Sequence, residues 1–290
     1  MPVSDLTRRI RYYVSNGGAV SIVDEFTNAI IKTINTGLGA TEVVKGDDER
    51  VYVANATADT ISSICINGTV KTYNIANNGF LDVYTDDAKL YASNGVTVTV
   101  NDLLSGSLLG TIAGFTDAQY IKLNKSGNLL YVADNGDNSI KIISTITLTE
   151  VGKITTGISK PTFILLSSDG TKLFVSNSGN STISVISLSD LSILNTFPLG
   201  QGVTPYGLAL FGNILYVANT AGTVIPVNIL AGTLLGVIAI IGNPQRVIVS
   251  PDKTRLYVTN SSAQNLSVSI IDPLTNTLTG TITGFTGAPI

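Results

Sequence analysis

The chain has 290 residues, a net charge of −3, a pI near 4.9 and only 13% charged residues. Its longest basic cluster is "RRIR" (8–11), so the positive surface that phosphate backbones require is missing and nucleic acid is not an expected partner. The absence of histidine and the single cysteine exclude His-dependent triads, His-ligated metals, cysteine clusters and disulfides within the chain.

A six-residue phrase recurs from one end of the chain to the other. Its seven copies, in order, are "RYYVSN" (11–16), "RVYVAN" (50–55), "KLYASN" (89–94), "LLYVAD" (129–134), "KLFVSN" (172–177), "ILYVAN" (214–219) and "RLYVTN" (255–260). The aromatic positions are Tyr13, Tyr52, Tyr91, Tyr131, Phe174, Tyr216 and Tyr257, spaced 39 to 43 residues apart. The alternation predicts a half-buried strand, and the period near 40 predicts a repeat architecture.

Each copy has the same neighbours, as the last repeat shows. The apolar run "RVIV" (246–249) and a polar turn precede the phrase, and "NLSVSIID" (265–272) and "LTGTITG" (278–284) follow it. Four short strands per unit are typical of a β-propeller blade. The sequence therefore predicts one all-β domain over residues 1–290, a seven-bladed propeller of four-stranded antiparallel blades centred on the seven aromatic positions.

The two ends of the chain suggest how such a ring would close. "GTIAGFTDA" (110–118) leads into an inner strand, and the nearly identical "GTITGFTGA" (280–288) leads into the last residues of the chain. Since closure removes exposed strand edges, we expect residues 286–290 to pair beside residues 2–6 in the first blade.

The recurring Tyr-Val-x-Asn with a following "SVSIID" resembles the YVTN family of β-propeller repeats, which occurs in bacterial and archaeal surface-layer and other secreted proteins and in relatives of lactonase-type propellers. The resemblance implies an extracellular or cell-surface protein, with a cytoplasmic location as the alternative. The N-terminus carries no apolar signal core, so we expect a mature or excised form. No stretch approaches the ~18 apolar residues of a membrane span.

One segment offers oxygen ligands for a metal. "DNGDN" (134–138) contains Asp134 and Asp137, and Ca²⁺ prefers carboxylate oxygens, but the order of ligands differs from the familiar calcium loop. Asn, Gly and Asp also form such turns through local hydrogen bonds. We expect no cofactor, with Ca²⁺ at these two residues as the alternative.

A ligand site is expected where the inner strands face the central channel. Aligning these strands on "RVIV" places one residue of each strand at the same height along the channel: Glu42, Asp82, Tyr120, Phe163, Gly207 and Arg246. Tyr206 lies next to Gly207 in the sequence and is added to this candidate site. The first blade would add Ile290 or a neighbour. Aromatic faces such as those of Tyr120, Phe163 and Tyr206 can stack on a sugar or an apolar group.

Two functions fit these observations. The first is a non-catalytic surface propeller that binds or scaffolds a protein or glycan at its loop face. The second is a carboxylate- or metal-dependent hydrolase of the lactonase-like type, with Glu42 and Asp82 as base or metal ligands, because neighbouring carboxylates shift each other's pKa. The missing histidines favour the first.

Overall fold

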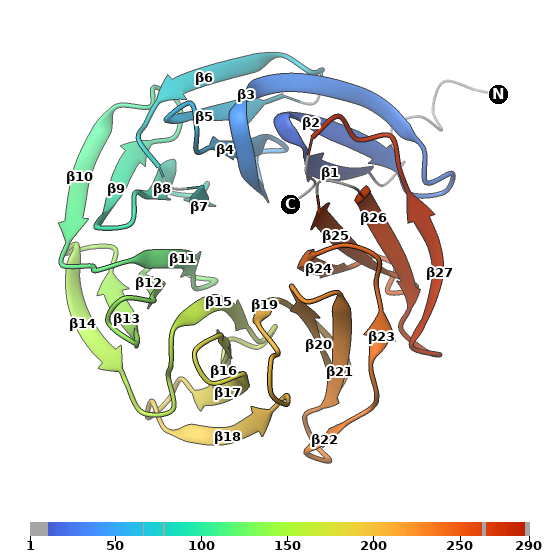
Figure 1. The fold of residues 1–290 in the computed structure, drawn as a ribbon. Helices are drawn as coiled ribbons and strands as arrows, with labels where there is room; N and C mark the ends of the chain where they lie inside the picture. Colours follow the sequence, from blue (N-terminus) through green and yellow to red (C-terminus); the bar gives the residue numbers. More distant parts are fainter. Residues whose placement is uncertain (1–10, 66, 78, 263–264, 288–290) are drawn as a thin grey trace.

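The structure, a computed structural model, describes residues 11–65, 67–77, 79–262 and 265–287. All the regular secondary structure in these residues consists of β-strands. The strands form antiparallel sheets arranged radially about a common centre (Figure 1). The prediction of an all-β propeller with four-stranded antiparallel blades is confirmed. No helix long and apolar enough to cross a membrane is found in this part of the chain.

Each sheet is built from strands that are consecutive in the chain. The first sheet contains β1 (Arg11–Ser15), β2 (Gly17–Asp24), β3 (Ile30–Lys45), β4 (Val51–Asn55), β5 (Thr60–Ile64) and β6 (Val70–Asn74). The second contains β7 (Phe80–Tyr84), β8 (Lys89–Ser93), β9 (Thr97–Asp102) and β10 (Leu108–Ala113). The third contains β11 (Ala118–Leu123), β12 (Leu129–Asp134), β13 (Ser139–Ser144) and β14 (Thr149–Ile154).

The remaining sheets complete the fold. The fourth contains β15 (Pro161–Leu166), β16 (Lys172–Asn177), β17 (Thr182–Ser187) and β18 (Ile193–Pro198). The fifth contains β19 (Pro205–Phe211), β20 (Ile214–Asn219), β21 (Thr223–Asn228), β22 (Thr233–Leu234) and β23 (Ile238–Ala239). The sixth contains β24 (Pro244–Val249), β25 (Leu256–Ser262), β26 (Asn265–Asp272) and β27 (Thr277–Ile282).

The described residues form six sheets, so the prediction of seven separate blades is wrong. The reason is β3, whose 16 residues stay extended: residues 30–35 pair with β2 and residues 40–45 pair with β4. Gly39, at φ +74°, lies where a Cβ would meet Thr57, so glycine lets the chain pass this point without a break. The first two repeats therefore share one six-stranded sheet.

Ring closure is the second correction. Among the described residues, no strand pairing joins the sheet of β24–β27 to the sheet of β1–β6, so the structure shows no closed ring. The predicted partners, residues 2–6 and 288–290, lie outside the described part of the chain, as does Ile290 of the predicted site. Gly287 is the last described residue, and a Cβ on it would lie 2.4 Å from the carbonyl oxygen of Asn16.

The repeated phrase forms the strand next to the innermost position, and it builds the core between neighbouring sheets. Its aromatic side chains are buried in six of the seven copies, with Tyr52, Tyr91, Phe174 and Tyr216 fully inaccessible to solvent. Tyr13 differs. It lies opposite Ile22 of the following strand, as the other repeat aromatics lie opposite a residue of their following strands, but it is only half-buried.

The Asn or Asp that ends each copy has a structural role. The Asn177 amide donates to the Ser184 hydroxyl at 2.9 Å, and its carbonyl oxygen accepts from the Ser159 N–H at 3.1 Å. Asp134, which replaces Asn in the fourth copy, accepts from the Asp117 N–H at 2.8 Å. These bonds tie the end of the repeat strand to the next strand and to the loop that enters the inner strand. In these two copies they satisfy buried polar groups, whereas the side-chain carbonyl oxygens of Asn16, Asn55 and Asn260 have no partner among the described residues.

Irregular pairing marks the start of five inner strands. The register shifts at the beginning of β3's second half, β11, β15, β19 and β24, at or next to the residues that face the centre. Three of these strands begin with proline, which is tolerated at the first residue of a strand and at bulges. A bulge re-aims the side chains in and after it, and in these strands the residues at or just after the shift line the channel: Glu42, Tyr120, Phe163, Tyr206 and Arg246.

Candidate functional site in the central channel

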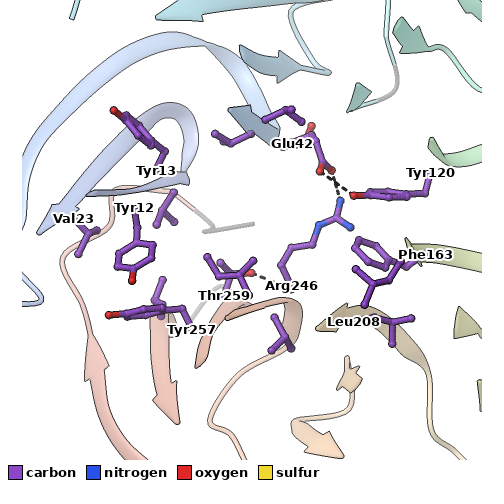
Figure 2. Close-up of a pocket in the computed structure, with 18 of the residues that line it drawn as sticks. Tyr12, Tyr13, Val23, Glu42, Tyr120, Phe163, Leu208, Arg246, Tyr257 and Thr259 are labelled. Atoms are coloured by element: carbon purple, nitrogen blue, oxygen red, sulfur yellow. Dashed lines mark hydrogen bonds and ion pairs between the residues drawn. The ribbon is translucent and has the colours of Figure 1, made fainter. Parts of the chain in front are cut away.

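An ion pair spans the channel between two distant parts of the chain. Arg246, from β24, donates through Nη2 to the Oε2 atom of Glu42, from β3, and Figure 2 shows the two side chains pointing toward each other. The hydroxyl of Tyr120, from β11, lies 3.5 Å from Glu42 Oε1, at the outer limit of a hydrogen bond. The radial arrangement brings these three residues together although 204 positions separate Glu42 from Arg246.

Aromatic rings surround the Arg246 guanidinium. Its Cζ atom lies 4.7 Å from the ring centre of Phe163, 4.9 Å from that of Tyr120 and 5.2 Å from that of Tyr206. Phe80, from β7, lies farther away at 6.0 Å. The rings also contact one another, and the Tyr120 and Phe163 centres are 4.2 Å apart. Such cation–π contacts hold a desolvated guanidinium in place. We call Glu42, Arg246 and the four rings the channel cluster.

The ion pair is largely removed from solvent. The side chains of Arg246 and Glu42 keep 12% and 10% of their accessible surface. Burial raises the pKa of the Glu42 carboxyl, and Arg246 offsets that rise only in part. Burial lowers the pKa of Arg246, but Glu42 and the tyrosines outweigh it, so the guanidinium stays charged. Arg246 Nη1 is buried and has no hydrogen-bond partner among the described residues.

The second predicted carboxylate, Asp82, lies at a different level. Asp82 pairs opposite Tyr91, as Lys122 pairs opposite Tyr131, so these two are neighbours on adjacent inner strands. Lys122 Nζ lies 3.0 Å from Asp82 Oδ2, and the Leu123 N–H donates to the same oxygen at 2.8 Å. Partial burial lowers the pKa of Lys122, but Asp82 and Glu42 outweigh it, so the net pKa is raised.

Phe80 lies at the height along the channel that the alignment of the inner strands on "RVIV" had assigned to Asp82. A spacing in the sequence could have found it, because Tyr120, Phe163 and Arg246 each precede their repeat aromatic by eleven residues. Counting eleven residues back from Tyr91 gives Phe80, whereas aligning on short apolar runs slips by two residues. A shift of two residues stays on the same face of the strand, so the alignment selected a residue that also faces the channel but lies farther along it.

Glycine is required at position 207 for the packing of two inner strands. Gly207 lies on β19 against β24, where an added Cβ would come within 2.5 Å of the Gln245 carbonyl oxygen and 2.7 Å of Arg246 Cα. Any side chain here would displace the backbone that carries Arg246. Its neighbour Tyr206 is half-buried and supplies this strand's ring to the channel cluster.

A cavity of about 330 Å³ adjoins the channel cluster. It extends from Glu42 and Arg246 toward β1, β2, β25 and β26, where Tyr12 and Tyr257 line it with ring centres 4.3 Å apart (Figure 2). The Tyr12 hydroxyl donates to Glu25 at 2.8 Å. Tyr13 lines the cavity as well, which explains why this one repeat aromatic is less buried. The sequence did not indicate this cavity, because it depends on how the first and last repeats meet.

The acids proposed as calcium ligands are held by lysines. Lys141 Nζ lies 2.9 Å from Asp134 Oδ2 and 3.3 Å from Asp137 Oδ2, and Lys153 Nζ lies 2.7 Å from Asp137 Oδ2. In the described chain, no three His, Cys, Asp or Glu side chains gather in a group that could hold a metal. A cation at this turn would have to displace both lysines, so the calcium site stays a prediction.

The charged side chains of the channel lie in pairs. Each channel carboxylate already has a cationic partner, Arg246 for Glu42 and Lys122 for Asp82. Aromatic faces beside a cavity are usual ingredients of a small binding site. Of the seven predicted residues that the structure describes, five come together, Gly207 packs against the backbone of Arg246, and Asp82 lies beside them: the five are Glu42, Tyr120, Phe163, Tyr206 and Arg246.

Comparisons with known proteins give the fold alone. No protein-family model matches the chain, so membership of the YVTN family is not confirmed, and no curated protein matches it either. Among solved structures, a Kuenenia stuttgartiensis hydrazine synthase chain is similar with a TM-score of 0.77 and 17% identity, over 90% of this chain and 92% of that one. A functionally unknown protein from Desulfotomaculum acetoxidans also gives 0.77, with 16% identity over 96% and 97%.

Proposed function

We propose that the protein is a non-catalytic binding or scaffold propeller of the YVTN type, located at the cell surface, and that it holds a protein or glycan partner at the mouth of its channel. The observation that carries the proposal is the channel cluster: a guanidinium enclosed by four rings and open to a cavity. A ring of purely structural residues has no need of that combination. Aromatic faces and arginine are also the groups that dominate recognition sites.

The surface chemistry supports this location. Only 13% of the residues are charged, about half the ~25% of average globular proteins, so Asn, Thr, Ser and backbone groups cover much of the exterior. The resemblance of the repeat to surface-layer proteins points the same way.

The test is a binding screen against glycan and peptide arrays with three proteins. The wild type should bind a partner that the double variant Arg246→Met/Tyr120→Leu loses, because that variant removes the cation and the ring that touches Glu42. Arg50→Met is the matched control, since the Arg50 side chain is half-buried beside Asp48 and is not part of the channel cluster. A partner that binds the folded double variant as tightly as the wild type would place its site elsewhere and defeat the proposal.

A hydrolase is the second candidate, and one observation favours it. Burial raises the pKa of Glu42, as in carboxyl groups that serve as general acids or bases. A panel of simple lactones, assayed with and without EDTA, tests this function. Turnover that disappears in Glu42→Gln/Asp82→Asn and persists in Arg50→Met would support it, whereas turnover retained by the double variant would remove both carboxylates from the mechanism.

A further inference from the structure

We propose, building on the binding function above, that the partner contributes an extended peptide segment, which adds to the inner edge of β1 as the innermost strand of the first repeat. The segment carries aliphatic residues at two alternate positions. Three features of the molecule lead to this inference: a strand edge, the cavity along it, and the residues that the other repeats place at the same position.

The inner edge of β1 differs from the corresponding edge of the other repeat strands. On this side, β4, β8, β12, β16, β20 and β25 each pair with an inner strand. β1 pairs with β2, and no strand among the described residues pairs with its other edge. The backbone N–H and C=O groups along such an edge are a template for a further strand.

β1 nevertheless holds the position that other repeat strands hold. In three repeats, the serine before the repeat Asn donates its hydroxyl to a carbonyl oxygen of the next inner strand. The pairs are Ser15 with Thr41 at 2.8 Å, Ser93 with Ala118 at 3.0 Å and Ser176 with Tyr206 at 2.6 Å. A strand added to β1 would therefore take its place in the ring of inner strands, between β24 and the second half of β3.

The cavity of about 330 Å³ lies at this place. Tyr12 and Tyr13 of β1, Glu42 of β3 and Arg246 of β24 all border it, so it is flanked by the two inner strands that a seventh would contact (Figure 2). A volume near the ~300 Å³ lower end of ligand pockets suits a short segment rather than a folded domain. We call the inner edge of β1 and this cavity the β1 slot.

The six inner strands of the fold show which residues suit the slot. Opposite the residue that follows the repeat aromatic, each of them places an aliphatic side chain: Val43, Leu81, Ile121, Ile164, Leu208 and Val247. Two positions later, five of them place another: Val83, Leu123, Leu166, Leu210 and Val249. The residue in between varies, from Asp82 to Leu165.

The same register defines the partner. The residue that follows the aromatic of the first repeat is Val14, and the one that precedes it is Tyr12. The added segment therefore places one aliphatic residue opposite Val14 and a second opposite Tyr12, with a variable residue between them. In strand addition, backbone hydrogen bonds supply affinity and alternate side chains supply specificity.

A peptide that copies an inner strand tests the inference. The acetylated and amidated peptide PQRVIVS has the sequence of residues 244–250. PQRNIVS replaces the first aliphatic residue, and PQRVNVS replaces the variable residue, whose counterpart Ile248 is 48% exposed in β24. Labelled peptides are titrated with the full-length protein at pH 7, and fluorescence anisotropy measures binding. Residues 1–10 and 288–290 are then present as competitors for the edge.

The position of the substitution should decide affinity. We expect PQRVNVS to bind within ~3-fold of PQRVIVS, and PQRNIVS at least ~10-fold more weakly, because only the latter loses a buried aliphatic side chain. Equal binding of PQRNIVS and PQRVIVS would overturn the inference, and so would the absence of binding by all three peptides at millimolar concentration.

Hydrogen exchange locates the bound peptide. On addition of PQRVIVS, backbone amides of β1 (Arg11–Ser15) should exchange more slowly, because strand pairing protects them. Those of β8 (Lys89–Ser93), which already pairs on both sides, should not change. Binding without protection of β1 would place the peptide elsewhere and defeat the proposal.

A matched pair of protein variants completes the test. Val14→Asp puts a charge opposite the first aliphatic residue of the peptide and should weaken the binding of PQRVIVS at least ~10-fold. Val96→Asp is the control, because Val96 is exposed between β8 and β9 and its replacement should leave binding unchanged. A circular-dichroism melt checks folding, and if Val14→Asp does not fold, the peptide ranking and the exchange of β1 still decide.

The peptide titration and the partner screen can fail separately. Selective binding of PQRVIVS with protection of β1, but no partner on any array, would support the strand inference and leave the binding function without a natural partner. A partner lost in Arg246→Met/Tyr120→Leu, together with no binding of the three peptides, would keep the function and refute strand addition.

Discussion

The repeat strands and the inner strands lie side by side in every repeat but the first, yet their residues behave in opposite ways. Along the repeat strands, an aromatic residue returns at each copy, and in six of the seven copies it is buried between neighbouring sheets. Along the inner strands, the residues that face the centre are a carboxylate, an arginine and four rings. The residues that hold the sheets together therefore recur in each repeat, whereas the residues that face the channel differ from one repeat to the next.

The physical reason lies in the number of packed faces. A repeat strand contacts a neighbouring sheet on each side, so only a residue of matching size fits at each position. An inner strand packs through alternate residues only, and the others face a space that the sheets share. Variation is therefore tolerated in the channel, and the function of a propeller can change there without a change of fold.

The largest expected difference between the two regions is in stability. Phe174, in the fifth copy of the phrase, has no exposed surface, whereas Phe163 in the channel cluster adjoins the cavity. Phe174→Ala should lower the free energy of unfolding by ~3–5 kcal/mol, and Phe163→Ala by at least ~1 kcal/mol less. Urea denaturation followed by far-UV circular dichroism measures both. Equal losses would mean that the channel residues belong to the core as fully as the repeat aromatics do.

A smaller effect should separate two copies of the repeat asparagine. Asn177 is buried and bonds across to Ser184 and Ser159, whereas Asn94 is exposed and bonds only within its own turn. Asn177→Ala should cost ~1–3 kcal/mol, because it leaves buried partners unsatisfied, and Asn94→Ala no more than ~0.5 kcal/mol. The same urea titration compares them, and a large loss in Asn94→Ala would contradict the structural role assigned to the others.

The smallest effect concerns one repeat tyrosine at high pH. Burial raises the pKa of Tyr216 to about 12, and its hydroxyl donates to the Pro273 carbonyl at 2.9 Å and to Asn276 Oδ1 at 2.6 Å. The neutral phenol is favoured in the fold, so its contribution to stability is complete below pH 10 and is lost as the pH rises toward 12.

Absorbance at 295 nm monitors this ionisation directly. The difference between wild type and Tyr216→Phe should show a single phenol that titrates near pH 12. A titration near the ordinary value of 10 would show that the hydroxyl is open to solvent.

The sequence predicted the blades well because local patterns control them. Period-two alternation and turn residues determine where strands begin and end, and the repeat aromatics identify the core. It could not predict that β3 continues through "NTGLG" (35–39), since Gly37 and Gly39 look like a turn. Only the contacts of those glycines with Asn55 and Thr57 show that they serve close packing.

The site was predicted in part for a similar reason. Strand level follows from spacing within a repeat, so Glu42, Tyr120, Phe163 and Arg246 were identified correctly as neighbours. The pairing of Lys122 with Asp82, and the cavity that Tyr12 and Tyr257 line, depend on contacts between repeats. No pattern within one repeat contains that information.

The shared strand β3 limits how this chain can be rearranged. Between β10 and β11, for example, neighbouring repeats belong to different sheets, and a new pair of chain ends could be introduced there without cutting any strand. A cut between residues 35 and 40 would divide a single strand that two repeats use. Duplication or loss of whole repeats would therefore be easiest away from the first two, which have to be inherited as one unit.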